Sequence, residues 1–370
     1  MKNFQNLYVH FPFCETKCHY CDFFSLPEKK VDTKKQHNIY DAILRELDFY
    51  PLTKLQTVFL GGGTPSLVPI EFLEKLFLKI QLEKKSETTA EVNPSSVDLR
   101  SAQSWCKLGI NRISMGVQAL DDKRLGWLGR VHNKKEVFCA LENIFMAGFE
   151  NVSVDYIVGV PEQTTDIIQK ELKELFSCFP EIMHVSAYLL TLKHSNPKYG
   201  SLLGEEEQLA QLLAVCDALR GYGFEHYEIS NFAKSNKQAL HNLNYWNAGS
   251  YLGIGPSAHS YWLEEKKRTK NWASLEKYQD LVLNQTPPIE WDETLTAEQE
   301  CIEYLMLKLR RKSGLNILEF NEKFGKDFYR QNLALLRELE SHGLAFFNEE
   351  AFSLTSKGFF ASDEIFPRLV

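Results

Sequence analysis

Short hydrophobic runs alternate with longer amphipathic segments through the first two-thirds of the chain. The short runs are rich in β-branched and aromatic residues, as strands are, and the longer segments repeat their apolar positions at helical spacing. The predicted strands are residues 7–13, 57–60, 88–92, 112–117, 152–158, 184–190 and 226–230. The predicted helices between them are 34–49, 72–82, 134–146, 167–176 and 205–219. Six or seven βα repeats of this kind predict an α/β fold with a parallel sheet, sufficient for a partial or complete barrel.

The last third of the chain has a different rhythm. Aromatic and polar loop-like sequence runs from Lys234 to Pro287 and Pro288, which predicts a linking region at 231–290 between a barrel at 1–230 and a third domain at 291–370. In that third domain, three amphipathic runs precede two short β-like runs. They are residues 297–310, 317–324, 328–342, 344–348 and 352–355. Three helices and a hairpin predict a small, mainly helical, winged-helix-like domain.

Glycines and polar residues gather where the predicted strands end. A group of cysteines follows the first strand, and residues 61–65 (Gly-Gly-Gly-Thr-Pro) follow the second. Glu91 ends the third strand, Gln118 follows the fourth, and Asp155 lies within the fifth. Because barrels built from βα repeats carry their chemistry at the C-terminal strand ends, this pattern predicts a site at that rim.

Charge and hydropathy exclude several classes of protein. A net charge of -7 without a Lys/Arg stripe is not the footprint of a nucleic-acid-binding protein, and the helix predicted at 328–342 has as many Glu as Arg residues. The chain contains no run of about 18 apolar residues, which an integral membrane segment would need. Residues 1–8 lack the basic-then-apolar pattern of a secretory signal. We therefore expect a cytoplasmic protein that binds no nucleic acid.

Three of the eight cysteines are close together, at Cys14, Cys18 and Cys21. Thiolates are the usual protein ligands of iron–sulfur clusters, and this spacing lets each bind a different iron of one [4Fe-4S] cluster, which leaves the fourth iron without a cysteine. The alternatives are three core cysteines or a zinc site completed by His19, although zinc sites usually have a second ligand pair downstream. The remaining cysteines are expected to be small buried residues: Cys106, Cys139, Cys178, Cys216 and Cys301.

The sequence Tyr-Val-His-Phe-Pro-Phe-Cys ending at Cys14, together with the cysteine spacing, resembles the radical-SAM superfamily in its oxygen-independent coproporphyrinogen III oxidase branch. The likeness runs through most of the chain and implies a partial TIM-like (β/α)6 radical-SAM barrel. In that superfamily S-adenosylmethionine chelates the open iron, and an electron from the cluster cleaves it to a 5′-deoxyadenosyl radical. The resemblance therefore also implies an electron donor for the cluster.

The resemblance also implies a set of S-adenosylmethionine contacts in this chain. Gly62, Gly63 and Thr64 match the motif that binds the methionine amino group, and Tyr20 would lie against the adenine. The other matching positions are Tyr8, Glu91, Gln118, Arg130 and Asp155. Carboxylates can accept bonds from ribose hydroxyls or an ammonium group, and a guanidinium can clamp a carboxylate. Each residue also has a plainer explanation as a tight turn, a surface charge, an ion pair or a packing contact.

Two features separate this chain from the decarboxylating enzymes of the branch. Those enzymes have a further cysteine where this chain has Phe23, and a long arm where only thirteen residues precede Cys14. The segment His241-Asn-Leu-Asn-Tyr-Trp246 instead resembles the H-N-x-x-Y-W signature of the HemW-type heme chaperones. This resemblance makes His241 a candidate heme ligand, because imidazole is a standard axial ligand of heme iron. The alternatives are a structural His241 or ligation by His10, His19 or His259.

The expected function is that of a heme chaperone, which binds heme and passes it to an acceptor hemoprotein, with the cluster and S-adenosylmethionine supporting assembly or transfer. No residue is assigned a catalytic role. The alternatives are an oxidoreductase that converts coproporphyrinogen III to protoporphyrinogen IX, and a winged-helix regulator that senses S-adenosylmethionine or heme.

Overall fold

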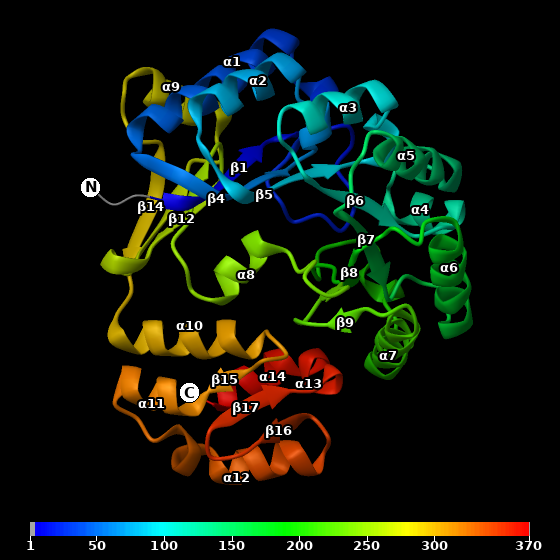
Figure 1. The fold of residues 1–370 in the computed structure, drawn as a ribbon, viewed down its shortest axis with the longest axis vertical. Helices are drawn as coiled ribbons and strands as arrows, with labels where there is room; N and C mark the ends of the chain where they lie inside the picture. Colours follow the sequence, from blue (N-terminus) through cyan, green and yellow to red (C-terminus); the bar gives the residue numbers. More distant parts are fainter. Residues whose placement is uncertain (1–3, 370) are drawn as a thin grey trace.

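A computed structural model describes residues 4–369 and is built around a nine-stranded sheet (Figure 1). In the order β11-β1-β4-β5-β6-β7-β8 all neighbours are parallel, and β10 and β9 continue the sheet by antiparallel pairing. The strands are β1 (Phe4–Phe11), β4 (Leu52–Gly62), β5 (Leu82–Val92), β6 (Arg112–Gln118), β7 (Val152–Val158), β8 (His184–Leu189), β9 (Glu225–His226), β10 (Asn231–Ala233) and β11 (Leu252–Ile254). Among the described residues β11 and β9 do not pair, so the predicted partial barrel is confirmed.

Helices cover the outer face of this sheet (Figure 1). They are α1 (Thr33–Glu46), α2 (Ile70–Lys79), α3 (Leu99–Lys107), α4 (Asp122–Leu128), α5 (Lys134–Met146), α6 (Thr165–Cys178) and α7 (Glu205–Gly221). Side-chain caps fix several of their starts: Asp32 accepts the Lys35 N–H at 2.9 Å, and Asn133 and Glu136 form a capping box. The helices α3 and α4 were not predicted from the sequence.

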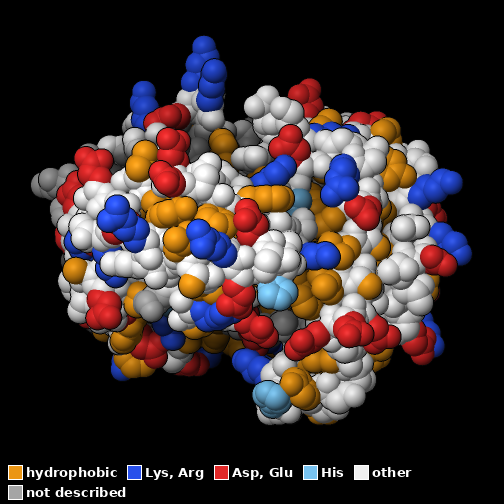
Figure 2. Space-filling model, turned by 90° about the horizontal axis from the view of Figure 1, so that it is seen from below, with side chains coloured by type: hydrophobic (Ala, Val, Ile, Leu, Met, Phe, Trp, Pro, Cys, Tyr) orange, Lys and Arg blue, Asp and Glu red, His pale blue; other side chains and the backbone are white. Residues whose placement is uncertain are grey.

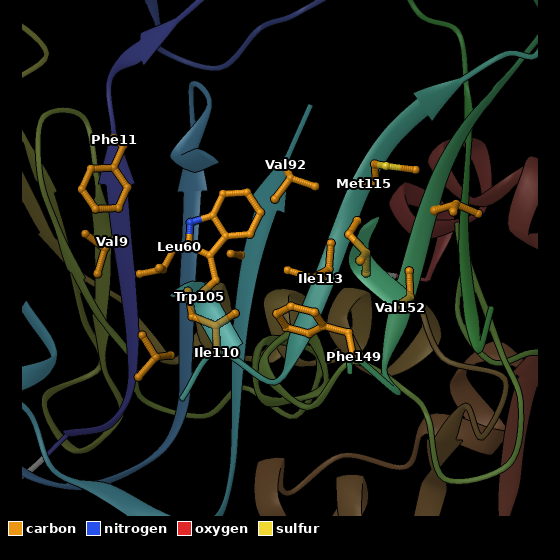
Figure 3. Close-up of a cluster of buried hydrophobic side chains, with 14 of the residues drawn as sticks. Val9, Phe11, Leu60, Val92, Trp105, Ile110, Ile113, Met115, Phe149 and Val152 are labelled. Atoms are coloured by element: carbon orange, nitrogen blue, oxygen red, sulfur yellow. The ribbon is translucent and has the colours of Figure 1, made fainter. Parts of the chain in front are cut away.

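The main core lies between the sheet and these helices. Every residue of β6 is buried, as expected for a parallel strand that is covered on both faces. Figure 3 shows a row of apolar side chains across the sheet, from Val9 of β1 to Val152 of β7, together with Trp105 of α3. Since these strands are apolar on the face toward the helices, the polar residues at their ends and on the inner face are left for the site.

The predicted linking region contains regular structure, so the expectation of loop-like sequence there was wrong. Its residues supply β10 and β11 of the main sheet and α8 (Leu240–Trp246). A second, antiparallel sheet follows, consisting of β12 (His259–Trp262), β13 (Lys267–Asn271) and β14 (Ile289–Thr294), with α9 (Leu275–Leu283) inserted before β14. These elements are short, and charges on both faces of β13 mask any apolar alternation.

The C-terminal part has the expected helices and hairpin around a core of its own. Its elements are α10 (Ala297–Leu309), β15 (Leu315–Asn316), α11 (Ile317–Phe324), α12 (Phe328–Ser341), β16 (Ala345–Phe347), β17 (Ala351–Leu354), α13 (Ser356–Phe360) and α14 (Ser362–Ile365). Leu309, Phe320 and Phe352 are buried in this second core. Hydrogen bonds join it to the barrel, including the Ile229 N–H to the Arg310 carbonyl at 3.0 Å and the Lys312 N–H to the Tyr227 carbonyl at 2.9 Å.

The surface of the protein carries charges of both signs. Positive and negative side chains are interspersed on the face drawn in Figure 2. None of the helices in residues 4–369 is both long enough and apolar enough to cross a bilayer.

Two cysteines outside the loop, Cys216 and Cys301, are buried as predicted, but that prediction was wrong for three others, which are exposed: Cys106, Cys139 and Cys178. Residues 1–3 and 370, which fall within the predicted N-terminal segment and domain limits, lie outside the described residues.

Candidate cluster and ligand site

The three clustered cysteines lie on a loop that is closed at its base. Cys14 ends the short strand β2 (Phe13–Cys14), which pairs in parallel with β3 (Leu26–Pro27) on the far side of the loop. The Leu26 N–H also donates to the Pro12 carbonyl at 2.8 Å. Within the loop, Lys17 donates to the Phe23 carbonyl and, at 3.2 Å, to the Ser25 hydroxyl. Backbone pairing and this lysine therefore hold the loop in a fixed outline.

The glycine turn after β4 packs directly on the cysteine strand. The Gly63 N–H donates to the Phe11 carbonyl at 2.7 Å, and the Thr64 N–H donates to the Phe13 carbonyl at 2.8 Å. A Cβ on Gly63 would lie 2.2 Å from the Phe13 carbonyl oxygen, so only glycine fits there. Gly62 has a φ of 107°, which also favours glycine. The turn and the loop thus form one assembly at the rim of the sheet.

A cavity of about 400 Å³ opens between this assembly and the ends of β5 to β8. Its wall includes all three clustered cysteines and most of the residues predicted from the sequence. These are Tyr20, Gly62, Gly63, Thr64, Glu91, Gln118, Arg130 and Asp155. The cavity also contacts Phe23, whose side chain is 64% exposed at the mouth. Residues from β4 to β8, from the cysteine loop and from the loop between α4 and α5 are therefore gathered in a single pocket.

Two half-buried carboxyl groups, those of Glu91 and Asp155, face this cavity. Glu91 accepts the Gly62 N–H at 3.2 Å, and Asp155 accepts the Ser114 hydroxyl at 3.2 Å. Burial, and then the charge of Asp155, raises the pKa of Glu91 to about 8. Burial also raises the pKa of Asp155, against the hydrogen bond from Ser186. Since no cation pairs closely with either group in the described residues, the pocket favours a positively charged ligand.

Arg130 is the cation of this pocket, and it is held from three sides. It donates to the Gly116 carbonyl at 2.8 Å, to the Asn93 side-chain oxygen at 3.0 Å and to the Cys18 sulfur at 3.5 Å. Its buried Nε has no partner in the described part of the chain. A Cβ on Gly116 would lie 2.4 Å from the guanidinium, so this glycine makes room for it. Arg130 is therefore positioned beside the cysteines, and of its five N–H groups only those on Nε and one on Nη1 have no hydrogen-bond partner in the described residues.

Sequence reasoning missed several residues of this wall. Asn93 bridges Arg130 and Thr64, to whose hydroxyl it donates at 3.0 Å, and Ser114 and Tyr188 also line the cavity. Asn93 follows the end of β5, so the strand-end rule that identified Glu91 could have found it as well. Gln118 has a φ of 67°, an uncommon conformation for a residue other than glycine, which turns the chain at the end of β6.

Tyr8 and His241 do not line this cavity. The Tyr8 hydroxyl is hydrogen-bonded to His10 Nδ1 at 3.0 Å, and a Cβ on Gly61 would lie 3.0 Å from the Tyr8 ring. His241 lies on α8, 1% exposed, with Nδ1 hydrogen-bonded to the Thr57 hydroxyl at 2.6 Å and Nε2 to the Tyr245 hydroxyl at 2.8 Å. Burial lowers the pKa of His241 to about 3. Both ring nitrogens are thus engaged, and ligation of a metal through this imidazole would require breaking one of these bonds.

The residues present fit a cubane cluster with S-adenosylmethionine. In the described residues, no group of three His, Cys, Asp or Glu side chains converges on one metal ion. A cubane instead needs three thiolates spread over separate irons, which suits three free cysteines around one cavity. The Arg130 guanidinium suits a ligand carboxylate, and the two carboxyl groups suit an ammonium and a sulfonium. An open α/β barrel with this rim is the arrangement of a radical SAM protein.

Comparison with known proteins agrees with the geometry. The family model described as Radical SAM superfamily matches residues 8–175, and the HemN C-terminal domain model matches residues 295–361. The chain belongs to the radical SAM superfamily. It is 32% identical to the heme chaperone HemW of Bacillus subtilis over 98% of both chains. It is also 30% identical to the heme chaperone HemW of Lactococcus lactis, over 98% of this chain and 96% of the relative.

A solved structure shares the fold over nearly the whole chain. It is the coproporphyrinogen III oxidase HemN of Escherichia coli, described as a radical SAM enzyme, with a TM-score of 0.82. The match covers 99% of this chain and 90% of that one at 20% identity. At this level of identity the match supports the arrangement of barrel and C-terminal elements and carries no information on activity.

Proposed function

We propose that this protein is a heme chaperone, which binds heme and transfers it to an acceptor hemoprotein. The observation that carries the proposal is the end-to-end similarity to proteins named heme chaperone HemW. The HNLNYW segment, which lies on α8, supports it, because this segment resembles the H-N-x-x-Y-W signature of HemW-type heme chaperones. Such a protein needs a site that binds heme and can release it, and it does not need to convert a porphyrin chemically.

The cluster and S-adenosylmethionine belong to the same proposal. Cys14, Cys18 and Cys21 would hold three irons, and the glycine turn, Glu91, Asp155 and Arg130 would hold the charged methionine end of the ligand. When bound, this pair supplies one-electron chemistry, for which a partner must donate the electron. The residues of the chain orient the ligand and exclude water from it. Whether heme transfer uses this chemistry is a separate question from whether heme binds.

The experiment uses anaerobically reconstituted full-length protein. One sample is titrated with hemin and then mixed with apomyoglobin as an acceptor. A parallel sample is incubated with coproporphyrinogen III, S-adenosylmethionine and a reductant. Stoichiometric hemin uptake and transfer, without porphyrin conversion, is the expected result. Steady production of protoporphyrinogen IX, or the absence of hemin uptake, would overturn the proposal in favour of the oxidase alternative or of neither function.

A further inference from the structure

A second cavity lies between the barrel and the C-terminal elements. Its volume is about 460 Å³, within the usual range for small-molecule sites, and it shares no lining residue with the cysteine cavity. Its walls come from α8, from β12 and β13 of the second sheet, and from α10 and α11 of the C-terminal part. The cavity thus joins three parts of the chain that are remote in sequence.

Aromatic side chains make up much of the wall. They are Tyr245, Trp246, Tyr251, Tyr261 and Tyr304, with Met306 beside them. The rings of Tyr245 and Tyr251 meet edge to face, with centroids 4.5 Å apart. Rings and a thioether of this kind favour a flat, polarisable ligand, which gains contact area without a large cost in side-chain ordering.

Two lining residues carry N–H donors without partners. Arg268 donates to Glu293 at 2.8 Å and to Glu303 at 2.7 Å through its terminal nitrogens, but its buried Nε has no partner in the described residues. The same holds for the buried indole nitrogen of Trp246, whose ring lies 4.4 Å from the Arg310 guanidinium. Buried donors left without acceptors are costly. Both donor atoms are buried behind the wall, and the charged lining residues are paired, Glu303 with Arg268 and Glu300 with Lys323, so the wall presents mainly its aromatic surface to a ligand.

The HNLNYW segment presents its tyrosine and tryptophan to this cavity. The hydroxyl of Tyr245 is held by His241, which is in turn held by Thr57 of β4. Tyr245 and Trp246 line the cavity, whereas His241 does not. His241 therefore acts as a positioning residue, which fixes the tyrosine ring from behind.

We propose that this cavity is the heme-binding site, with the porphyrin ring against the aromatic wall. This inference rests on the proposed function and names its site. The lining holds two kinds of side chain that bind heme iron in other proteins, the Met306 thioether and tyrosine hydroxyls. This heme-binding site shares no lining residue with the S-adenosylmethionine pocket, so heme and S-adenosylmethionine can be bound at the same time.

The test uses the reconstituted full-length protein and hemin titrations followed by Soret absorbance. The double variant Tyr261→Ala/Met306→Ala removes part of the wall and should weaken hemin binding about tenfold or more, a loss of about 1.4 kcal/mol. Met146→Ala is the matched control, because Met146 is 69% exposed on α5 and far from the cavity in sequence. Cluster content and S-adenosylmethionine binding should not change in either variant.

A second variant guards against a folding defect. Leu263→Trp adds bulk at a lining position that is 40% exposed and should also reduce hemin affinity. Stoichiometric hemin uptake that both the double variant and Leu263→Trp leave unchanged would overturn this site alone. Failure of the parent protein to take up hemin would overturn the proposed function, and the site with it.

Discussion

The contact between the glycine turn and the cysteine strand predicts a sharp effect of Gly63→Ala. The new Cβ would lie 2.2 Å from the Phe13 carbonyl oxygen and 2.6 Å from its carbon, where real Cβ contacts are essentially never under 3.0 Å. Both partners are backbone, so no side chain can rotate away. The turn must move, which breaks the hydrogen bonds from Gly63 to Phe11 and from Thr64 to Phe13.

Two such bonds contribute about 1 kcal/mol each, so we expect a loss of about 2 kcal/mol together with a displaced Cys14. The assay is the melting temperature of the apoprotein, with iron and sulfide content after anaerobic reconstitution. Gly126→Ala is the control, since a Cβ there meets nothing within 4 Å and alanine favours the helix α4. If Gly63→Ala melted and assembled its cluster as Gly126→Ala does, the packing argument would be refuted.

Three further predictions follow from the site and its surroundings. Because the pKa of Glu91 is raised to about 8, the carboxyl is mainly protonated below that pH, and affinity for the cationic S-adenosylmethionine should fall as the pH drops from 9 to 6.5. Equilibrium binding of S-adenosylmethionine to the reconstituted protein measures this change. The Glu91→Gln variant should bind S-adenosylmethionine weakly and with little pH dependence. An affinity of the parent protein that stays constant between pH 9 and 6.5 would contradict the reasoning. Gly116→Ala should displace the Arg130 guanidinium, which lies 2.4 Å from the new Cβ, and weaken S-adenosylmethionine binding about tenfold with a smaller change in melting temperature; equal affinity in variant and parent would show that Arg130 does not hold the ligand. Burial raises the pKa of Glu46 to about 7, so the folded state loses stability as pH rises from about 4.5 to 7, by roughly 3 kcal/mol. Glu46→Gln should flatten that part of the curve of melting temperature against pH, and identical curves for variant and parent would count against it.

The sequence was sufficient to predict the parallel sheet because its strands are short runs rich in β-branched residues that alternate with longer amphipathic segments. It did not show α3, which buries only Ala102 and Trp105 and so has too few apolar positions for a clear period. It also did not show β13, whose lysines and arginine pair with acidic residues of β14, as Lys270 does with Glu290 at 2.8 Å. Short or charged elements depend on their neighbours more than on their own pattern.

The same difference holds for the candidate site. Strand ends in a parallel sheet meet at one rim, so Glu91, Gln118 and Asp155 could be grouped from their positions alone. The need for glycine at 116 comes from Arg130, which approaches it through the fold rather than along the chain. The environment of His241 was equally hidden, because its partner Thr57 is 184 residues away. A histidine in a motif can therefore hold a neighbouring side chain in place, as His241 holds Tyr245, rather than bind a ligand.

The pairing of β2 with β3 has a consequence for how the cluster is acquired. Since strand pairing closes the loop at Phe13 and Leu26, its shape is set by the polypeptide and does not wait for iron. Cluster assembly would then consist of delivering iron and sulfide to a loop that is already formed. We therefore expect the apoprotein to hold its three clustered cysteines together before iron arrives.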